Sequence, residues 1–297
     1  MPQLSSTLKR PSLLIVGCGD VGLRVVKLLR SRWRLIALTS DPERVASLRA
    51  AGAVPLVGNL DAPATLARLA GLTDAVLHLA PPPNLGETDP RTRNLLQALA
   101  RQGRVRRIVY ASTSGVYGDC GGALINETRR PKPASARALR RVDAEQRLRW
   151  YGRAFGARVT LLRIPGIYAL DREGGDPRVR VARGTPVLAA ADDVYTNHIH
   201  ADDLARACVA ALSRGAPQRA LNICDATELK MGDYFDLVAD LHGLARPPRI
   251  TRAEAAVQMA PMQLSFMNES RRLSNQRMRR ELRLRLRYPT VADGLKA

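Results

Sequence analysis

Three glycines near the start of the chain have the spacing of a phosphate-binding turn. The segment Gly17-Cys18-Gly19-Asp20-Val21-Gly22 follows an apolar run at 13–16 and precedes apolar residues at helical spacing. In such a turn the first glycine allows the tight bend, the second lets the backbone approach a pyrophosphate, and the third lets helix and strand pack closely. The helix N-terminal amides hold the anion. We therefore expect a dinucleotide site formed by Gly17, Gly19, Asp20, Val21 and Gly22.

The end of the second predicted strand bears on the choice between NAD and NADP. A carboxylate there would bind the ribose 2′-hydroxyl, whereas a hydroxyl or an arginine would accept a 2′-phosphate. Thr39 and Ser40 stand at this point, followed by Asp41 and Arg44. Ser40 and Arg44 favour the phosphate, while Asp41 would favour the diol but also suits the start of a helix. The pattern favours NADP slightly and leaves NAD open.

Cysteines and histidines do not have the spacing of a metal site. The four cysteines are far apart, with no C-x-x-C pair and no histidine at ligand spacing. His198 and His200 alternate as on a strand edge, which favours a structural role, and Asp202-Asp203 is typical of a helix start. We expect no metal, no disulfide framework and a cytoplasmic location.

The predicted elements must place these candidates at one edge of a sheet. The apolar patterns predict strands at 13–16, 35–38, 54–57, 75–79, 108–111, 159–163 and 220–224. They predict helices after the glycine turn, up to residue 49, near 63–69, and at 91–101, 138–151, 201–212 and 230–244. Such alternation requires a parallel sheet covered on both faces. The expected fold class is α/β, a Rossmann-type doubly wound parallel sheet with a smaller C-terminal substrate lobe.

Changes in pattern divide the chain into two lobes. We expect a dinucleotide-binding domain at 11–165 that resumes at 196–226, and a smaller substrate lobe at 166–195 and 227–297. Glycines and prolines interrupt the pattern after residue 165. Near the C-terminus Leu282, Leu284 and Leu286 alternate with arginines, which predicts a half-buried strand.

Five segments in order resemble the extended short-chain dehydrogenase/reductase superfamily, of the NAD-dependent epimerase/dehydratase type. They are the glycine turn, His78-Leu79-Ala80, the stretch 110–118, the stretch 162–168 with Pro165, and the stretch 197–204. The resemblance covers nearly the whole chain. It implies that Ala80 and Pro165 border the cofactor and that Asn59-Leu60 lies against the adenine.

The resemblance also implies a catalytic set from which this chain departs. That family uses a Ser/Thr and a Tyr-x-x-x-Lys pair; Thr113 matches the first, but Arg137 and Arg141 stand at the Tyr and Lys positions. Arginine does not deprotonate in proteins, so it does not replace the tyrosine as acid or base. Ser114 and Gly115 stand where dehydratases of the family have an acidic pair. The chain resembles the atypical branch of the superfamily.

The residues present offer one candidate for a substitute acid and one pair of cations. Tyr117, four residues past Thr113, is a candidate acid, although a structural role is the better account of it. Arg137 and Arg141, four residues apart on one helix face, either bind an anionic substrate or form a solvated basic face.

The charge balance invites a nucleic-acid interpretation that the motifs do not support. The 297 residues carry 47 Lys+Arg against 27 Asp+Glu, a net charge of +20, with only five lysines. Arginine-rich composition accounts for this charge, and no nucleic-acid-binding motif is recognised. The apolar run at 13–16 is too short for a membrane span.

The sequence thus favours an NAD(P)-binding, epimerase/dehydratase-like oxidoreductase of the atypical extended type. We expect a small, anionic substrate of unknown identity. The resemblance implies that two copies pair through two helices of the cofactor domain. A non-catalytic NAD(P)-binding sensor is the alternative, because the Tyr and Lys are absent.

Overall fold

A computed structural model describes residues 10–296. Its central sheet has seven parallel strands, β1 (Ser12–Val16), β2 (Arg34–Thr39), β3 (Val54–Val57), β4 (Ala75–His78), β5 (Arg107–Thr113), β7 (Arg158–Ile164) and β12 (Arg219–Asn222). They lie in the order β12-β7-β5-β4-β1-β2-β3. The order reverses direction between β1 and β4, so the carboxyl ends of these two strands flank the crevice in which such sheets bind ligands.

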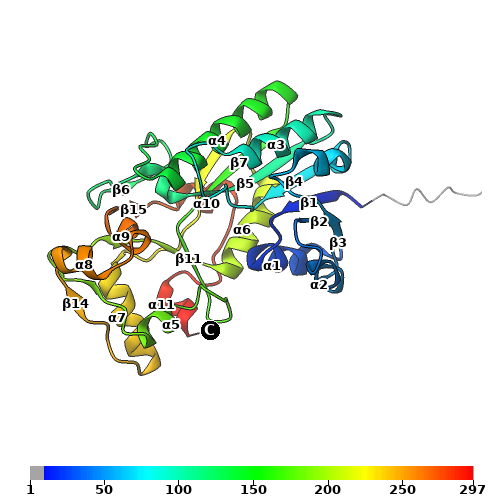
Figure 1. The fold of residues 1–297 in the computed structure, drawn as a ribbon. Helices are drawn as coiled ribbons and strands as arrows, with labels where there is room; N and C mark the ends of the chain where they lie inside the picture. Colours follow the sequence, from blue (N-terminus) through cyan, green and yellow to red (C-terminus); the bar gives the residue numbers. More distant parts are fainter. Residues whose placement is uncertain (1–9, 297) are drawn as a thin grey trace, which may run out of the picture.

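Helices cover both faces of this sheet (Figure 1). One face carries α1 (Asp20–Leu29), α2 (Arg44–Ala51) and α6 (Ala201–Arg214), and the other carries α3 (Pro90–Ala100), α4 (Ala136–Phe155) and the 3₁₀ helix η1 (Pro63–Leu69). A second 3₁₀ helix, η2 (Ser114–Tyr117), follows β5. The predicted α/β class and doubly wound sheet are confirmed.

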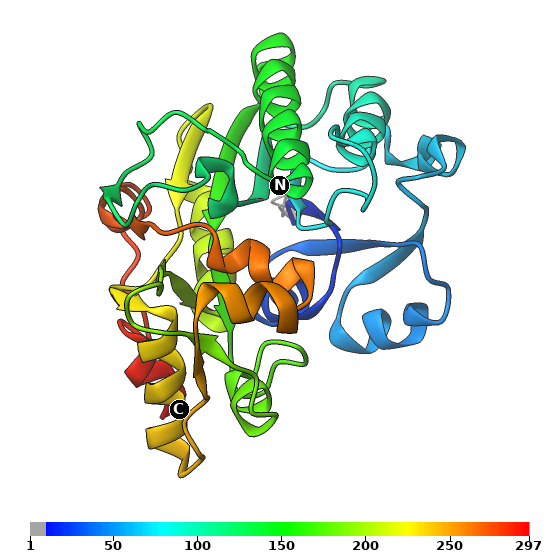
Figure 2. The same cartoon turned by 60° about the vertical axis from the view of Figure 1, so that its left-hand side comes forward.

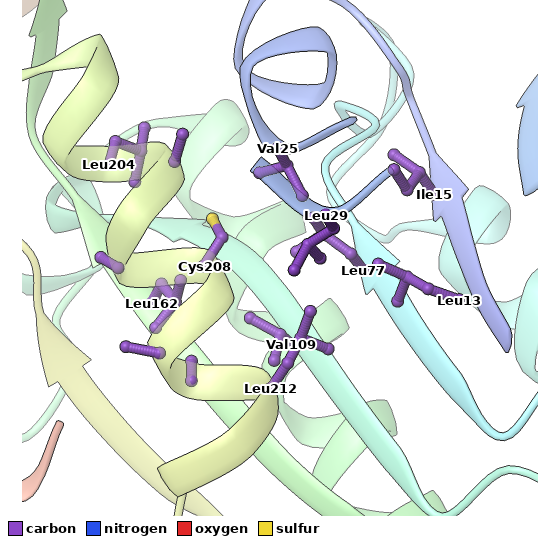
Figure 3. Packing of buried hydrophobic residues seen from close by; sticks show 14 of the residues in the cluster. Leu13, Ile15, Val25, Leu29, Leu77, Val109, Leu162, Leu204, Cys208 and Leu212 are labelled. Carbon is purple, nitrogen blue, oxygen red and sulfur yellow. The ribbon is translucent and has the colours of Figure 1, made fainter. Parts of the chain in front are cut away.

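Alternate residues of each central strand point to opposite faces, which explains their continuous apolar character. Leu13 and Ile15 pack on the α1 and α6 side, whereas Leu14 and Val16 pack on the α3 and α4 side. Figure 3 shows Leu204, Cys208 and Leu212 of α6 on the first of these sides, together with residues of α1. The packing fixes where each strand ends and thereby positions the site.

The smaller lobe has its own apolar core. Its elements are β8 (Gly166–Tyr168), α5 (Pro177–Ala182), β9 (Val187–Leu188), β10 (Tyr195–Thr196), β13 (Leu229–Lys230), α7 (Met231–His242), β14 (Arg249–Ile250), α8 (Arg252–Gln258), α9 (Pro261–Met267) and α11 (Val291–Leu295). Short pairs connect the lobes: β8 pairs with β11 (His198–His200), and β6 (Leu124–Ile125) pairs with β15 (Arg272–Leu273). Figure 2 shows α8 and α9 in orange, in front of the sheet.

The C-terminal leucines are buried without forming the predicted strand. Helix α10 (Gln276–Glu281) and the residues after it return to the larger lobe, where Met278, Leu282 and Leu284 join the core beside α6. Arg283 has a φ of +48°, so the backbone is not extended there and pairs with no strand. The alternating Leu282 and Leu284 are buried as predicted, but the strand prediction is wrong because Arg283 adopts the left-handed conformation.

The helix expected near 63–69 is present as a 3₁₀ helix. Most other predicted elements are confirmed, with ends that shift by a few residues. Within residues 10–296 no helix is long and apolar enough to cross a membrane.

Candidate functional site

The glycine turn has the geometry that a dinucleotide requires. Gly17 has a φ of +85°, and a Cβ added to it would lie 2.5 Å from the Ala80 nitrogen. A Cβ on Gly22 would lie 3.2 Å from Cys18 Sγ, which shows how closely the helix packs on the turn. By contrast, a Cβ on Gly19, the N-cap of α1, would meet nothing within 4 Å. The turn is therefore open where α1 presents its N-terminal amides, and its residues fit a pyrophosphate.

A cavity of about 340 Å³ lies between this turn and the ends of β2 and β3. Thr39, Ser40, Asp41 and Arg44 line it, as the sequence predicts for the adenosine side. Arg44 Nη2 donates to the Cys18 carbonyl at 2.7 Å, so the guanidinium links the turn to the start of α2. Asp41 Oδ1 accepts the Glu43 N–H at 2.9 Å, which ties that carboxylate to the start of α2. Ser40 is exposed.

The other predicted cofactor residues divide between this cavity and its surroundings. Asn59, Leu60 and Ala80 line it, with Asn59 Oδ1 accepting the Asp61 N–H at 2.9 Å. Val21 packs instead against the core, and Asp20 turns its carboxylate towards arginines. At the rim Asp61 pairs with Arg91, whose hydrogen bond lowers the pKa of this carboxyl.

A second cavity, of about 590 Å³, lies where the two lobes meet. Thr113, Arg137, Arg141 and Pro165 line it from the larger lobe. The smaller lobe and the connecting strands add side chains that the sequence did not identify: Arg172, Arg180, Tyr195, Asn197, His198, Phe266, Glu269 and Arg271. Three of the four predicted catalytic residues thus lie around one space.

The two arginines of α4 hold different positions in this cavity. Arg141 Nη1 donates to the Tyr110 hydroxyl at 3.0 Å and to the Ala111 carbonyl at 2.7 Å, so β5 anchors it. Arg137 lies over the Phe266 ring at 4.4 Å, and burial lowers its pKa while nearby Glu269 opposes this shift. Among the described residues neither arginine has a carboxylate within salt-bridge distance.

Thr113 is the last residue of β5, and its hydroxyl oxygen accepts one hydrogen bond. Its Oγ1 accepts the Gly115 N–H at 3.2 Å and caps η2. The hydroxyl proton stays available for a bond to a molecule in the cavity, because an acceptor role leaves the O–H free to donate.

Tyr117 lies in the interior rather than at the cavity. Its hydroxyl donates to Asn222 Oδ1 at 2.7 Å, and the Arg163 guanidinium lies 4.8 Å from the ring centroid. Burial raises the pKa of this phenol. These contacts give Tyr117 a structural role that joins η2 to the end of β12.

A buried ion pair keeps α4 in place beneath its two arginines. Glu145 of α4 accepts from Arg163 at 3.1 and 2.8 Å and from the Ser112 hydroxyl at 2.6 Å. Both charged side chains are buried, so the pair anchors the helix to β5 and β7. That anchoring fixes how far Arg137 and Arg141 reach towards the cavity.

The residues missed by the sequence come from loops that only the fold brings together. Arg271 donates to Glu269 at 2.7 Å and to the Gly118 carbonyl at 2.6 Å. Arg180 lies over the Phe235 ring at 4.5 Å and has no carboxylate partner among the described residues. No motif marks these positions; an excess of arginine on both sides of one cavity is visible only in three dimensions.

The two strand histidines are structural in large part. His200 Nδ1 accepts the Asp202 N–H at 3.2 Å and caps α6. His198 stacks on Tyr234 at 3.9 Å and lines the larger cavity, and burial lowers its pKa to about 3. Within the described chain no group of three or more His, Cys, Asp or Glu side chains is arranged to hold a metal ion.

Known proteins share both the sequence pattern and the fold. The model of the NAD dependent epimerase/dehydratase family matches residues 13–224. GDP-6-deoxy-D-mannose reductase of Pseudomonas aeruginosa is 30% identical over 213 residues, which cover 62% of this chain and 69% of that protein.

Solved structures extend the likeness over almost the whole chain. A conserved protein of unknown function from Silicibacter pomeroyi has a TM-score of 0.81 at 29% identity, covering 96% of this chain and 97% of that one. MoeE5 in complex with UDP-glucose and NAD has a TM-score of 0.76 at 22% identity, covering 96% of each chain. The open glycine turn, the ordered landmarks and these matches agree, and the chain belongs to the NAD dependent epimerase/dehydratase family as an NAD(P)-binding, oxidoreductase-like member.

Proposed function

We propose that this protein is an NAD(P)-dependent oxidoreductase or epimerase-like enzyme whose small substrate is anionic. The observation that carries the proposal is the pair Arg137 and Arg141, which line the larger cavity beside Thr113 with no described carboxylate within salt-bridge distance of either. A cation partly removed from water is stabilised by a bound anion. Nucleotide sugars, such as the substrate class named for the Pseudomonas relative, and small carbonyl acids are the compounds to test first.

Each side chain has a separate task in this proposal. The bound nicotinamide cofactor supplies the hydride chemistry. Thr113 donates its hydroxyl proton in a hydrogen bond to the reacting oxygen, and Arg137 holds the anionic group of the substrate. Neither arginine transfers a proton, because the guanidinium stays charged. The proton that accompanies the hydride therefore comes from water, from the substrate or from another group of the cavity, such as Tyr195 or Glu269.

We infer NADP as the preferred cofactor. Ser40 and Arg44 border the smaller cavity with an exposed side chain and a cation, while Asp41 Oδ1 accepts the Glu43 N–H. A 2′-phosphate would gain a charge-assisted hydrogen bond from Arg44. The 2′-hydroxyl of NAD would instead have to bond to Asp41, whose Oδ1 already accepts the Glu43 N–H and whose other oxygen remains as an acceptor.

A non-catalytic cofactor sensor is the second candidate. Arg141 supports it, because this side chain bonds to Tyr110 and Ala111 at the position where the family has lysine. A sensor would bind the cofactor tightly and turn over none of the substrates offered.

We also propose that two copies pair through α3 and α4. Trp150 and Phe155 of α4 are 59% and 36% exposed, and they border an apolar groove between the two helices that Leu96 and Tyr151 also line. Large aromatic side chains that remain exposed in a groove are typical of an interface.

Replacing Gly19 with Val tests cofactor binding directly. NADPH or NADH should raise the melting temperature of the parent. A ligand at 100 times its dissociation constant raises the free energy of unfolding by roughly 2.7 kcal/mol. The Gly19→Val variant should lose this shift, since its side chain would occupy the space of the pyrophosphate. Because that space is open, the variant without ligand should melt close to the parent.

Gly17→Ala provides the matched control. Its Cβ would collide with the Ala80 backbone, so this variant should be less stable even without cofactor. A parent protein whose melting temperature responds to neither cofactor would refute the proposal.

A further inference from the structure

Arg172 connects the substrate cavity to the glycine turn. It lies on the loop after β8, lines the larger cavity, and places its Nε 3.1 Å from Asp20 Oδ2. Its Nη1 also donates to the Ile167 carbonyl at 3.3 Å. Asp20 is the first residue of α1 and directly follows Gly19. One side chain of the substrate side is therefore bonded to the segment that fits the pyrophosphate.

Asp20 belongs to a cluster in which carboxylates outnumber arginines. Arg24 contacts Asp20 at 3.1 Å, but the same guanidinium also contacts Asp171 at 2.6 Å and Asp202 at 2.5 Å. Three carboxylates thus share Arg24. Arg172 supplies a second cation to the cluster, and it bonds to the carboxylate nearest the glycine turn.

The loop leaves room for this arginine. Backbone bonds from Arg172 to the Ala169 carbonyl, and from Gly175 to the Arg172 carbonyl, close it into a tight turn. A Cβ on Gly175 would lie 2.3 Å from Arg172 Nη1 and 2.8 Å from its Cδ. A side chain at 175 would therefore occupy space that Arg172 uses in its path to Asp20.

We propose that Arg172 is a positioning residue for the cofactor: it neutralises Asp20, so that the pyrophosphate can bind at the open end of α1 beside a carboxylate. The inference rests on the proposed function, which supplies the pyrophosphate. Left with only its share of Arg24, this carboxylate would repel a doubly charged group bound at the same helix terminus and would cancel part of the attraction of that terminus. Paired with Arg172, it does neither.

The experiment measures the dissociation constant of NADPH by calorimetry for four proteins: the parent, Arg172→Ala, Asp20→Asn and the double variant. Arg172→Ala should bind roughly tenfold more weakly, a difference of about 1.4 kcal/mol. In the double variant most of the affinity should return, because the charge that Arg172 neutralised is gone. The tenfold loss should also shrink at about 1 M salt, where screening acts within a few ångströms.

Two further variants separate charge from loop structure. Gly175→Ala keeps both charges but displaces Arg172, so it should weaken binding in the same direction. Arg183→Ala removes an exposed arginine from the same lobe, at the C-terminal end of α5, and should leave the affinity unchanged.

The outcomes distinguish this inference from the function on which it rests. The inference is refuted, and the function stands, if the parent binds NADPH but Arg172→Ala binds it as tightly as Arg183→Ala does. The same holds if the double variant binds NADPH no more tightly than Arg172→Ala. If the parent itself binds no cofactor, both are refuted.

Discussion

At the scale of single residues, the cavity is equipped to hold charge, while the tyrosine and the histidine buried beside it are poorly suited to move protons. Tyr110 lies near the cavity, but its hydroxyl accepts from Arg141 and burial raises its pKa to about 12. His198 is buried with its pKa lowered to about 3, so it is neutral at physiological pH. Thr113, at the end of β5, lines the cavity with a hydroxyl that can still donate its proton, and Tyr195 and Glu269 line the same cavity.

Replacing Thr113 separates an enzyme from a sensor. We expect Thr113→Ala to leave NADPH affinity nearly unchanged and to lower turnover by the order of 10²-fold that a lost transition-state donor typically costs. Thr113→Ser retains both the hydroxyl and the cap on Gly115, so it should keep most of the activity. Absorbance of the reduced cofactor reports turnover on a panel of nucleotide sugars and small carbonyl compounds.

Each result on that panel has a meaning. Turnover that survives Thr113→Ala unchanged would remove Thr113 from the site. Tight cofactor binding without turnover by the parent on any compound would favour the sensor.

At the scale of elements, the end of β12 carries a buried carboxyl that makes stability depend on pH. Asp225 Oδ1 accepts the Thr227 N–H at 2.9 Å, and its Oδ2 is buried without a hydrogen-bond partner among the described residues. Burial raises the pKa of Asp225 to about 7, and the carboxylates of Asp203 and Asp293 add to the shift. The folded protein therefore holds a proton that the unfolded chain releases.

Asp225→Asn should remove this dependence. Between pH 4 and pH 7 the folded parent binds more protons at this site than the unfolded chain, so the contribution of Asp225 to the free energy of unfolding falls as pH rises. The variant keeps the oxygen that accepts from Thr227. Its free energy of unfolding, relative to that of the parent, should rise by about 2 kcal/mol or more from pH 4 to pH 8, since one pKa unit is about 1.4 kcal/mol. Urea titrations at the two pH values measure the difference. A gap between variant and parent that is the same at both would contradict the assignment.

The elements also show where sequence patterns stop being informative. Local rules placed the glycine turn, because Gly17 and Gly22 are needed by contacts within one strand, turn and helix. They also placed Thr113 at a strand end. They did not place Arg172 or Glu269, which reach the cavity from loops, and loop direction depends on packing between lobes. The strand predicted around Leu284 was wrong because periodicity reports which side chains are buried and not whether a neighbouring strand exists.

At the scale of the whole molecule, arginine dominates the charged contacts. Ion pairs across the described chain use arginines, from the exposed pair Arg246 with Asp240 to the buried pair Arg163 with Glu145. Many arginines therefore form ion pairs within the protein or stack on aromatic rings, as Arg137 does on Phe266. The composition does not predict these contacts.

Pairing of two copies is testable through one exposed residue. Trp150→Glu should convert the proposed dimer to monomer, because a carboxylate would have to be buried in the groove between α3 and α4. Sedimentation velocity of parent and variant measures the change, and Val257→Glu, at an 87% exposed position on α8, is the control. A parent that sediments as a monomer would contradict the pairing.

The core beside α6 stays incomplete until the ribosome has made nearly the entire chain. Met278 and Leu282 fill that core, yet they follow the helices of the smaller lobe in the sequence. During synthesis the apolar surface beside α6 therefore stays exposed until more than fifty residues after β12 have been added. A chaperone that shields such surfaces during translation should raise the yield of folded protein more than one supplied after release.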